Sequence, residues 1–86
     1  MADTLGLLEE ARHLARDLGY EVGEEPLGDL PGGPCRVGHR TRILLNIAHP
    51  PAEQLAVLLA ALAADPAIEG QPKSRLLAER LAHGGR

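Results

Sequence analysis

Aromatic residues are almost absent from this chain of 86 residues, because Tyr20 is the only one and neither Trp nor Phe occurs. A single cysteine, Cys35, excludes an internal disulfide and therefore a disulfide-stabilised scaffold. No apolar run approaches the roughly 20 residues that a membrane-spanning helix requires. No basic and apolar leader segment follows Met1. We therefore expect a cytoplasmic protein that does not associate with a membrane.

Basic charge is also scarce, since 9 Lys and Arg stand against 12 Asp and Glu, for a net charge of −3. A nucleic-acid-binding domain usually has a basic surface and aromatic side chains on which bases stack, so nucleic acid is not an expected partner. The sequence contains neither of the common glycine-rich phosphate-binding motifs, and no cofactor is expected. One Lys beside eight Arg, with abundant Ala, Leu and Gly, indicates a bacterial chain.

The length of the chain predicts a single domain over residues 1–86. A first helix is expected between a cap at Asp3 or Thr4 and Gly19, because the apolar residues recur at helical spacing. These residues are Leu7, Leu8, Ala11, Leu14, Ala15 and Leu18. Residues 20–24 alternate apolar and polar side chains, which predicts a strand, and residues 26–34 are rich in Pro and Gly, which predicts a loop.

Residues 35–37 and 41–47 are predicted to form a hairpin around Gly38, His39 and Arg40. A two-residue turn would mix apolar and charged side chains on one face of the hairpin. A three-residue turn is therefore expected, with Val37 opposite Thr41. It would place five apolar side chains on one face of the sheet, namely Cys35, Val37, Ile43, Leu45 and Ile47.

A second helix is expected to begin at residues 49–51 and to end at Asp65, and it is apolar without interruption from residue 55 to residue 64. Ser74 is expected to cap a third helix that carries Leu76, Leu77 and Leu81 on one side, with residues 84–86 frayed. The predicted fold is α+β, in the order helix, strand, hairpin, helix, helix, with a three-stranded antiparallel sheet.

The second helix is apolar around its whole circumference, which is more apolar surface than a small domain readily covers. Apolar surface that stays exposed often indicates an interface with another protein. The predicted function is therefore a non-enzymatic protein-interaction or self-associating module, either a homo-oligomer or the binder of a protein partner. Its interface residues would be the large side chains of this helix, Leu55, Leu58, Leu59 and Leu62.

An anion-binding or phosphate-binding module is the first alternative. Residues 1–34 carry two basic and eight acidic side chains, whereas residues 35–49 carry three Arg and no acid. The predicted register places Arg36 and Arg42 opposite each other, with His39 nearby. The competing and favoured interpretation is that Glu21, Glu24 or Glu25 neutralises these arginines within the chain.

A thiol enzyme is the second alternative, with Cys35 as a nucleophile beside Arg36. His39 and His49 are the candidate bases, but nothing in the sequence fixes either near the thiol. A buried structural cysteine is the favoured interpretation, and the chain is expected not to be an enzyme. No metal site is expected, because the histidines and Cys35 do not form the close-spaced pairs that zinc sites use.

Residues 35–64 resemble the strand-to-helix segment that precedes the zinc-binding helix of small gluzincin-type metallopeptidases. The resemblance rests on a hairpin ending in Leu-Leu-Asn, then Pro, then a helix that contains Glu-Gln. That family carries His-Glu-x-x-His on the helix, whereas Ala60, Ala61 and Ala64 stand here. The resemblance therefore implies no hydrolase activity. The whole chain also resembles short, uncharacterised bacterial proteins, which implies no activity.

Overall fold

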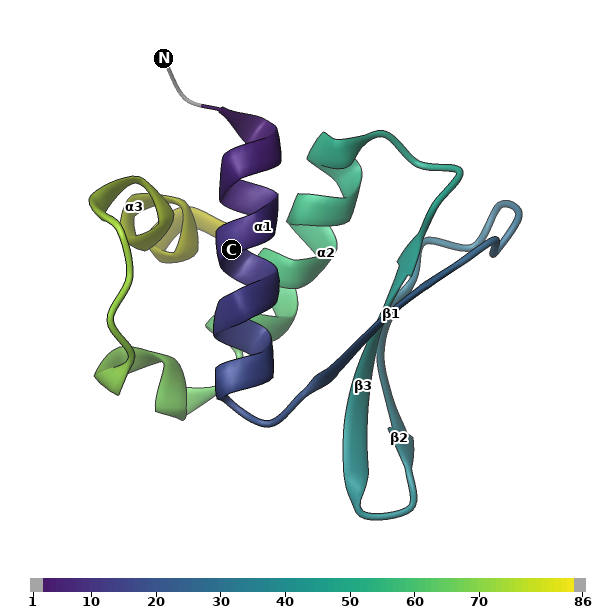
Figure 1. Cartoon of the computed structure of the whole chain (residues 1–86), viewed down its shortest axis with the longest axis horizontal. Coiled ribbons are helices and arrows are strands. Elements are labelled where there is room, and N and C mark those ends of the chain that lie inside the picture. Colours follow the sequence, from purple (N-terminus) through teal and green to yellow (C-terminus); the bar gives the residue numbers. More distant parts are fainter. Residues whose placement is uncertain (1–2, 85–86) are drawn as a thin grey trace.

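The computed structural model describes residues 3–84 and combines three α-helices with one three-stranded sheet (Figure 1). The elements in chain order are α1 (Thr4–Asp17), β1 (Glu21–Glu25), β2 (Gly33–Val37), β3 (Arg40–Asn46), α2 (Pro51–Ala63), the 3₁₀-helix η1 (Pro66–Gly70) and α3 (Arg75–Gly84). The predicted α+β class is therefore confirmed. The predicted fraying of residues 84–86 falls largely outside the described residues, although α3 extends to Gly84.

The first helix forms as the periodicity predicts. The Asp3 side chain caps α1 by accepting a hydrogen bond from the Leu5 N–H at 3.1 Å. The helix ends before Gly19, which adopts a left-handed conformation with φ of 97°. Its apolar stripe packs against α2 and is buried.

The other two helices also begin near the predicted positions. Pro51 occupies the first turn of α2, where the missing N–H of proline costs nothing. The Ser74 Oγ accepts a hydrogen bond from the Leu77 N–H at 3.1 Å at the start of α3. In α3 the structure buries Leu77, whereas Leu76 is exposed. The segment between α2 and α3 contains η1, which the Asp65 side chain caps.

The sheet is mixed, so the predicted antiparallel arrangement is wrong. The strand order is β1-β3-β2, with β1 parallel to β3 and β2 antiparallel to β3. A meander would have placed β2 in the centre, but Pro34 lacks the N–H that a central strand needs. The most apolar strand, β3, takes the centre instead, and its Ile43 and Leu45 are fully buried.

The hairpin turn has two residues, so the predicted three-residue turn is also wrong. Val37 pairs with Arg40, and Cys35 pairs with Arg42. Gly38 has φ of 64° at the first central position, whereas His39 has a negative φ, which is typical of a type II′ turn. The turn residues thus decide the register in spite of the apolar pattern.

Three of the predicted inward side chains lie elsewhere, two of them because of this register. Cys35 and Val37 share a face with Arg40 and Arg42, and the side chain of Val37 is 57% exposed. Ile47 lies beyond the end of β3 and is 53% exposed. Arg36 lies opposite Thr41, so the two arginines of the proposed anion site do not face each other.

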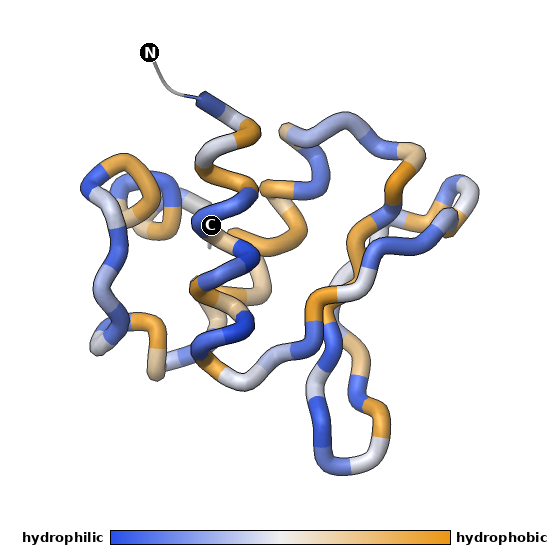
Figure 2. Tube along the Cα trace, viewed as in Figure 1, coloured by the Kyte–Doolittle hydropathy of each residue, from blue (hydrophilic) through white to orange (hydrophobic). Residues whose placement is uncertain are grey.

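The three helices lie on one face of the sheet, which we call the inner face (Figure 1). The alternating pattern of the strands places Thr41, Ile43 and Leu45 on this face and Arg40, Arg42 and Leu44 on the outer face. Apolar residues accordingly gather between α1, α2 and the sheet, as Figure 2 shows. The core contains Leu7, Leu8, Ala11, Leu14, Ala15, Ile43, Leu45, Leu55, Leu58, Leu59, Leu62, Ile68 and Leu77.

The buried polar residue Asn46 ties the loop between β1 and β2 to the end of β3. Its Nδ2 donates to the carbonyl oxygens of Gly28 and Leu30, at 2.9 and 2.8 Å. Its Oδ1 accepts from the N–H groups of Leu27 and Ala48, at 3.2 and 3.0 Å. This loop fixes where β2 enters the sheet.

Candidate interaction surface

The four leucines predicted as an interface lie in the core of a single chain. Leu55, Leu58 and Leu62 have no exposed surface, and Leu59 is 3% exposed. The helices α1 and α3 and the strands β2 and β3 all pack against α2. The exposed side chains of α2 are small or polar and include Glu53, Ala56 and Ala60. A partner would therefore have to contact residues other than these leucines.

Two of the hairpin arginines pair with glutamates of β1 on the outer face. Arg42 lies 3.7 Å from Glu21 Oε1 and 3.6 Å from Glu25 Oε2. It reaches both by lying over Gly23, where an added Cβ would be only 2.6 Å from Arg42 Nη2. Arg40 donates a hydrogen bond to Glu21 at 2.9 Å. This bond lowers the pKa of Glu21, partly opposed by desolvation, and the charges of Arg40 and Arg42 lower it further.

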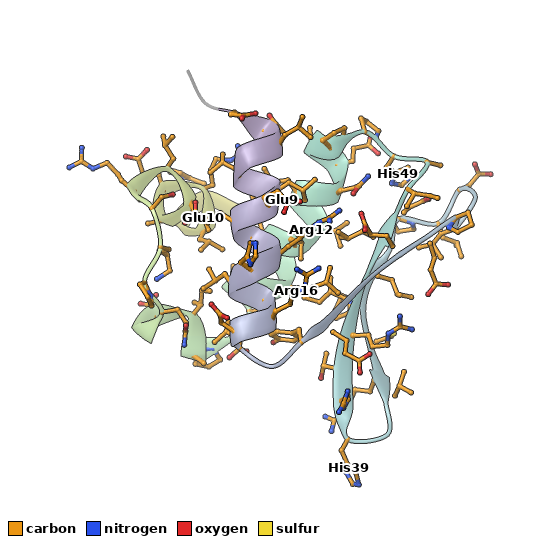
Figure 3. The ribbon with its side chains drawn as sticks, viewed as in Figure 1. Glu9, Glu10, Arg12, Arg16, His39 and His49 are labelled. Carbon is orange, nitrogen blue, oxygen red and sulfur yellow. The ribbon has the colours of Figure 1, made fainter. Side chains whose placement is uncertain are left out.

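These pairs leave little of the proposed anion site. Arg42 is occupied by the carboxylates of β1, as the competing interpretation expected for this residue. The third glutamate of β1, Glu24, pairs instead with Arg12 of α1. Arg36 is exposed and makes no ion pair with any residue between 3 and 84. His39 lies at the tip of the hairpin, where it is exposed (Figure 3).

The thiol of Cys35 has no hydrogen-bonded base among the described residues. Cys35 is half-buried on the outer face of β2, where its backbone pairs with Arg42 of β3. Figure 3 shows His39 and His49 at opposite ends of the hairpin, and His49 lies 3.4 Å from Glu53 of α2. Within residues 3–84 no group of three or more metal-binding side chains comes together. The same residues contain no helix that is long and apolar enough to cross a membrane.

An open groove runs between the C-terminal half of α2 and the inner face of the hairpin. Its volume is about 420 Å³, and its wall is mostly apolar. We call it the alanine groove, since small side chains of α2 form its floor. It is lined by Tyr20, Pro34, Thr41, Ala60, Ala61, Ala64, Asp65 and Pro66.

A polar pair, Tyr20 and Asp65, lies in the lining of the alanine groove. The Tyr20 hydroxyl donates a hydrogen bond to Asp65 Oδ2 at 2.7 Å, and the Ala67 N–H donates to Asp65 Oδ1 at 2.9 Å. The hydrogen bond to Asp65 raises the pKa of Tyr20, with smaller effects of the same sign from burial and from the charge of Asp65. The same bond lowers the pKa of Asp65, as does the bond from Ala67. The carboxylate is thus already satisfied by the chain itself.

A second hollow lies on the outer face beside β2. It has a volume of about 300 Å³ and a mostly apolar wall, and it is lined by Leu27, Leu30, Pro31, Gly32, Gly33, Pro34, Cys35 and Leu44. Leu30 is 64% exposed at its rim, and Val37 is exposed further along the same face of β2. We call it the outer hollow. Apolar surface therefore lies on both faces of the sheet next to β2.

The side of β2 that faces away from β3 is unpaired in the described chain, because β2 is the last strand of the sheet. We call it the β2 edge. Residues that flank a two-residue turn bond to each other, and bonded pairs alternate along an antiparallel ladder. Cys35 and Val37 therefore bond to β3, whereas the backbone groups of Pro34 and Arg36 point outward. The β2 edge offers two carbonyl oxygens and the Arg36 N–H.

Comparison of the chain with protein-family models, with curated proteins and with solved structures finds no match. The three alanines that replace the zinc-binding motif in the gluzincin resemblance, Ala60, Ala61 and Ala64, all line the alanine groove. The groove therefore has no metal ligand at these positions.

Sequence reasoning missed both the alanine groove and the β2 edge. The groove had a signal in the alanines that recur on one side of α2, because small side chains leave space beside a helix. The edge had a signal in Pro34, since proline within a sheet is confined to edge strands.

Proposed function

We propose that the protein is a non-enzymatic interaction module that binds a protein partner at the β2 edge. The observation that carries this proposal is the position of β2, which is unpaired on one side and flanked by apolar surface on both faces. Exposed apolar surface that adjoins an unpaired strand is a common site of partner binding.

The side chains around the edge support a binding role over a structural one. Val37 and Leu30 are exposed on the outer face, and Pro34 and Thr41 line the groove on the inner face. None of them is needed to fill the core, which lies between the helices and the inner face of β3. Exposed apolar residues of this kind add nothing to the stability of the free protein but contribute to affinity when a partner covers them.

The two alternative functions have less support from the same geometry. An anion site would need several free cations, but Arg40 and Arg42 are paired with glutamates. A thiol enzyme would need a base beside Cys35, and no side chain within residues 3–84 forms a hydrogen bond with its thiol.

Site-specific photo-crosslinking in the producing cell tests the proposal. A photoreactive amino acid replaces Val37 at the β2 edge in one variant and Leu76 of α3 in a matched control. Both native side chains are apolar and similarly exposed, at 57% and 47%. We expect a covalent product with another protein from position 37 and none from position 76.

Three results would contradict the proposal. Identical products from the two positions would show that contact is unspecific. The absence of a product from position 37 would show that the β2 edge has no partner in the cell. A product with a second copy of this chain would replace the proposed partner by self-association.

A further inference from the structure

We infer that the partner segment is an extended, acidic stretch of polypeptide that adds to the sheet as a fourth strand alongside β2. This inference rests on the proposed function and specifies the chemistry of its partner. Three independent features of the β2 edge carry it, namely its backbone, the surfaces on its two faces and its charge.

The backbone of the edge accepts a strand. The outward-pointing groups are the carbonyl oxygens of Pro34 and Arg36 and the N–H of Arg36. An added strand would therefore form main-chain hydrogen bonds centred on Arg36. Because Pro34 has no N–H, the strand would form fewer such bonds than at an edge without proline. Because main-chain bonds carry no sequence information, the side chains on each face must select the partner.

The two faces determine which side chains fit. Successive side chains of a strand point to opposite faces, so every second residue of the partner would lie on the inner face. On the inner face, a partner residue opposite Pro34 would contact the alanine groove. A partner residue opposite Arg36, two positions away, would contact the arginine side chain. The outer face would present Cys35 and Val37 to the intervening residues. The predicted pattern is an acidic residue two positions from a medium-sized apolar residue.

The charges around the β2 edge favour a negatively charged partner segment. Arg36 is the one arginine of the three strands that no carboxylate within residues 3–84 neutralises. The nearest acidic group of the groove, Asp65, already accepts hydrogen bonds from Tyr20 and Ala67. A carboxylate of the partner would therefore be attracted to the unpaired Arg36, whereas a lysine of the partner would be repelled by it.

A peptide with a palindromic sequence is a suitable probe of this surface. It presents the same order of side chains whether it pairs parallel or antiparallel to β2. The probe is the blocked peptide Ser-Val-Thr-Glu-Thr-Val-Ser with a dye at one end for fluorescence anisotropy. A second peptide has Lys in place of Glu. A third is N-methylated at every residue from the first Val to the second, which removes the main-chain donors of both parallel and antiparallel pairing. An unlabelled acidic peptide is followed by the fluorescence of Tyr20, which is the sole aromatic residue of the chain and lines the groove.

We expect the acidic peptide to bind about fivefold more tightly than the Lys peptide at low salt, as one exposed ion pair allows. The variant Arg36→Glu should reverse this preference. The control Arg80→Glu, at an exposed position of α3, should keep it. The N-methylated peptide should bind with much lower affinity than the acidic peptide. The fluorescence of Tyr20 should change only when a peptide binds. Thermal unfolding of both variants checks that they retain the fold.

Three outcomes would overturn the inference and separate it from the proposed function. Equal affinity for the acidic and Lys peptides would refute selection by charge. Undiminished binding of the N-methylated peptide would refute strand addition. If no peptide binds while position 37 still crosslinks to a protein, the partner is not an extended segment, yet the interaction module stands. If both experiments fail, the proposed function fails as well.

Discussion

The two edges of the sheet have opposite character. The β1 edge carries Glu21, Glu24 and Glu25, and each of them forms an ion pair with an arginine of β3 or α1. The β2 edge carries apolar residues and a single unpaired cation, Arg36. Both strands are short and flank the same central strand, β3.

The difference indicates that only one edge is protected. Charged side chains on an edge strand discourage pairing with another chain, because an added strand would have to desolvate them. The β1 edge has this protection. At the β2 edge the protection is weaker, because Arg36 is a single charge and Pro34 removes only one donor, and the flanking apolar surface stays accessible. A protein without a partner would be expected to protect both edges.

The largest expected effect concerns the residue that fixes β2 next to β3. Asn46→Ala removes a buried polar side chain and leaves the backbone groups of Leu27, Gly28 and Leu30 without the hydrogen bonds that join the β1–β2 loop to β3. We expect a loss of about 3 kcal/mol in the free energy of unfolding, since an unsatisfied buried polar group costs about 1–3 kcal/mol. Urea denaturation followed by circular dichroism measures it. A loss below about 1 kcal/mol would show that the loop does not depend on Asn46.

A smaller loss is expected from Gly32→Ala, just before β2. Gly32 has φ of +80°, and an added Cβ would lie 2.4 Å from the backbone oxygen of Leu44. Both the strained conformation and the contact are unfavourable, so we expect a loss of about 2 kcal/mol in the free energy of unfolding. Gly70→Ala is the matched control, because Gly70 has an ordinary φ and open space. Equal stability of the two variants would contradict the close approach of the loop to β3.

The Tyr20–Asp65 pair predicts a pH-dependent contribution to stability in the lining of the alanine groove. The lowered pKa of Asp65 makes its contribution complete above about pH 4 and lost as the pH falls through the lowered value. The raised pKa of Tyr20 makes its contribution complete below about pH 10 and lost as the pH rises through the raised value. The stability difference between the native protein and Tyr20→Phe should therefore be largest between these limits. A difference that does not vary with pH would contradict the hydrogen bond.

The smallest effect on stability is expected at the β2 edge itself. Val37→Glu places a charge on an exposed position, so the free energy of unfolding should change by less than about 0.5 kcal/mol. The same change makes the outer face of β2 acidic, as β1 is, and should weaken binding of the acidic peptide. Chemical denaturation and the peptide titration measure the two effects. A large loss of stability would show that Val37 belongs to the core.

The helices could be predicted from the sequence because their signals are local. Apolar spacing, the Asp3 and Ser74 caps, and the proline at the start of α2 all act within a few residues of the elements that they define. The structure places each helix close to its predicted position. The mistake about α2 concerned its surroundings, because periodicity shows that a helix is apolar but not how many neighbours cover it.

The sheet and the candidate site could not be predicted in the same way, because they depend on pairing between distant segments. The parallel pairing of β1 with β3 joins residues about twenty positions apart, and no local pattern specifies it. The hairpin register was predictable in principle, since Gly38 at the first turn position favours a two-residue turn. The apolar alternation of the strands favours the other register, which places Cys35 and Val37 on the wrong face.

Amide NMR spectroscopy during titration with the acidic peptide tests the contrast between the two edges most directly. The account predicts that the largest shifts fall on Arg36 and Val37 of the β2 edge and on Ala60 and Ala64 of the alanine groove. Glu21 and Glu24 at the β1 edge should not shift. Shifts that centre on β1, or that are equal at both edges, would contradict the claim that β2 alone is open to a partner.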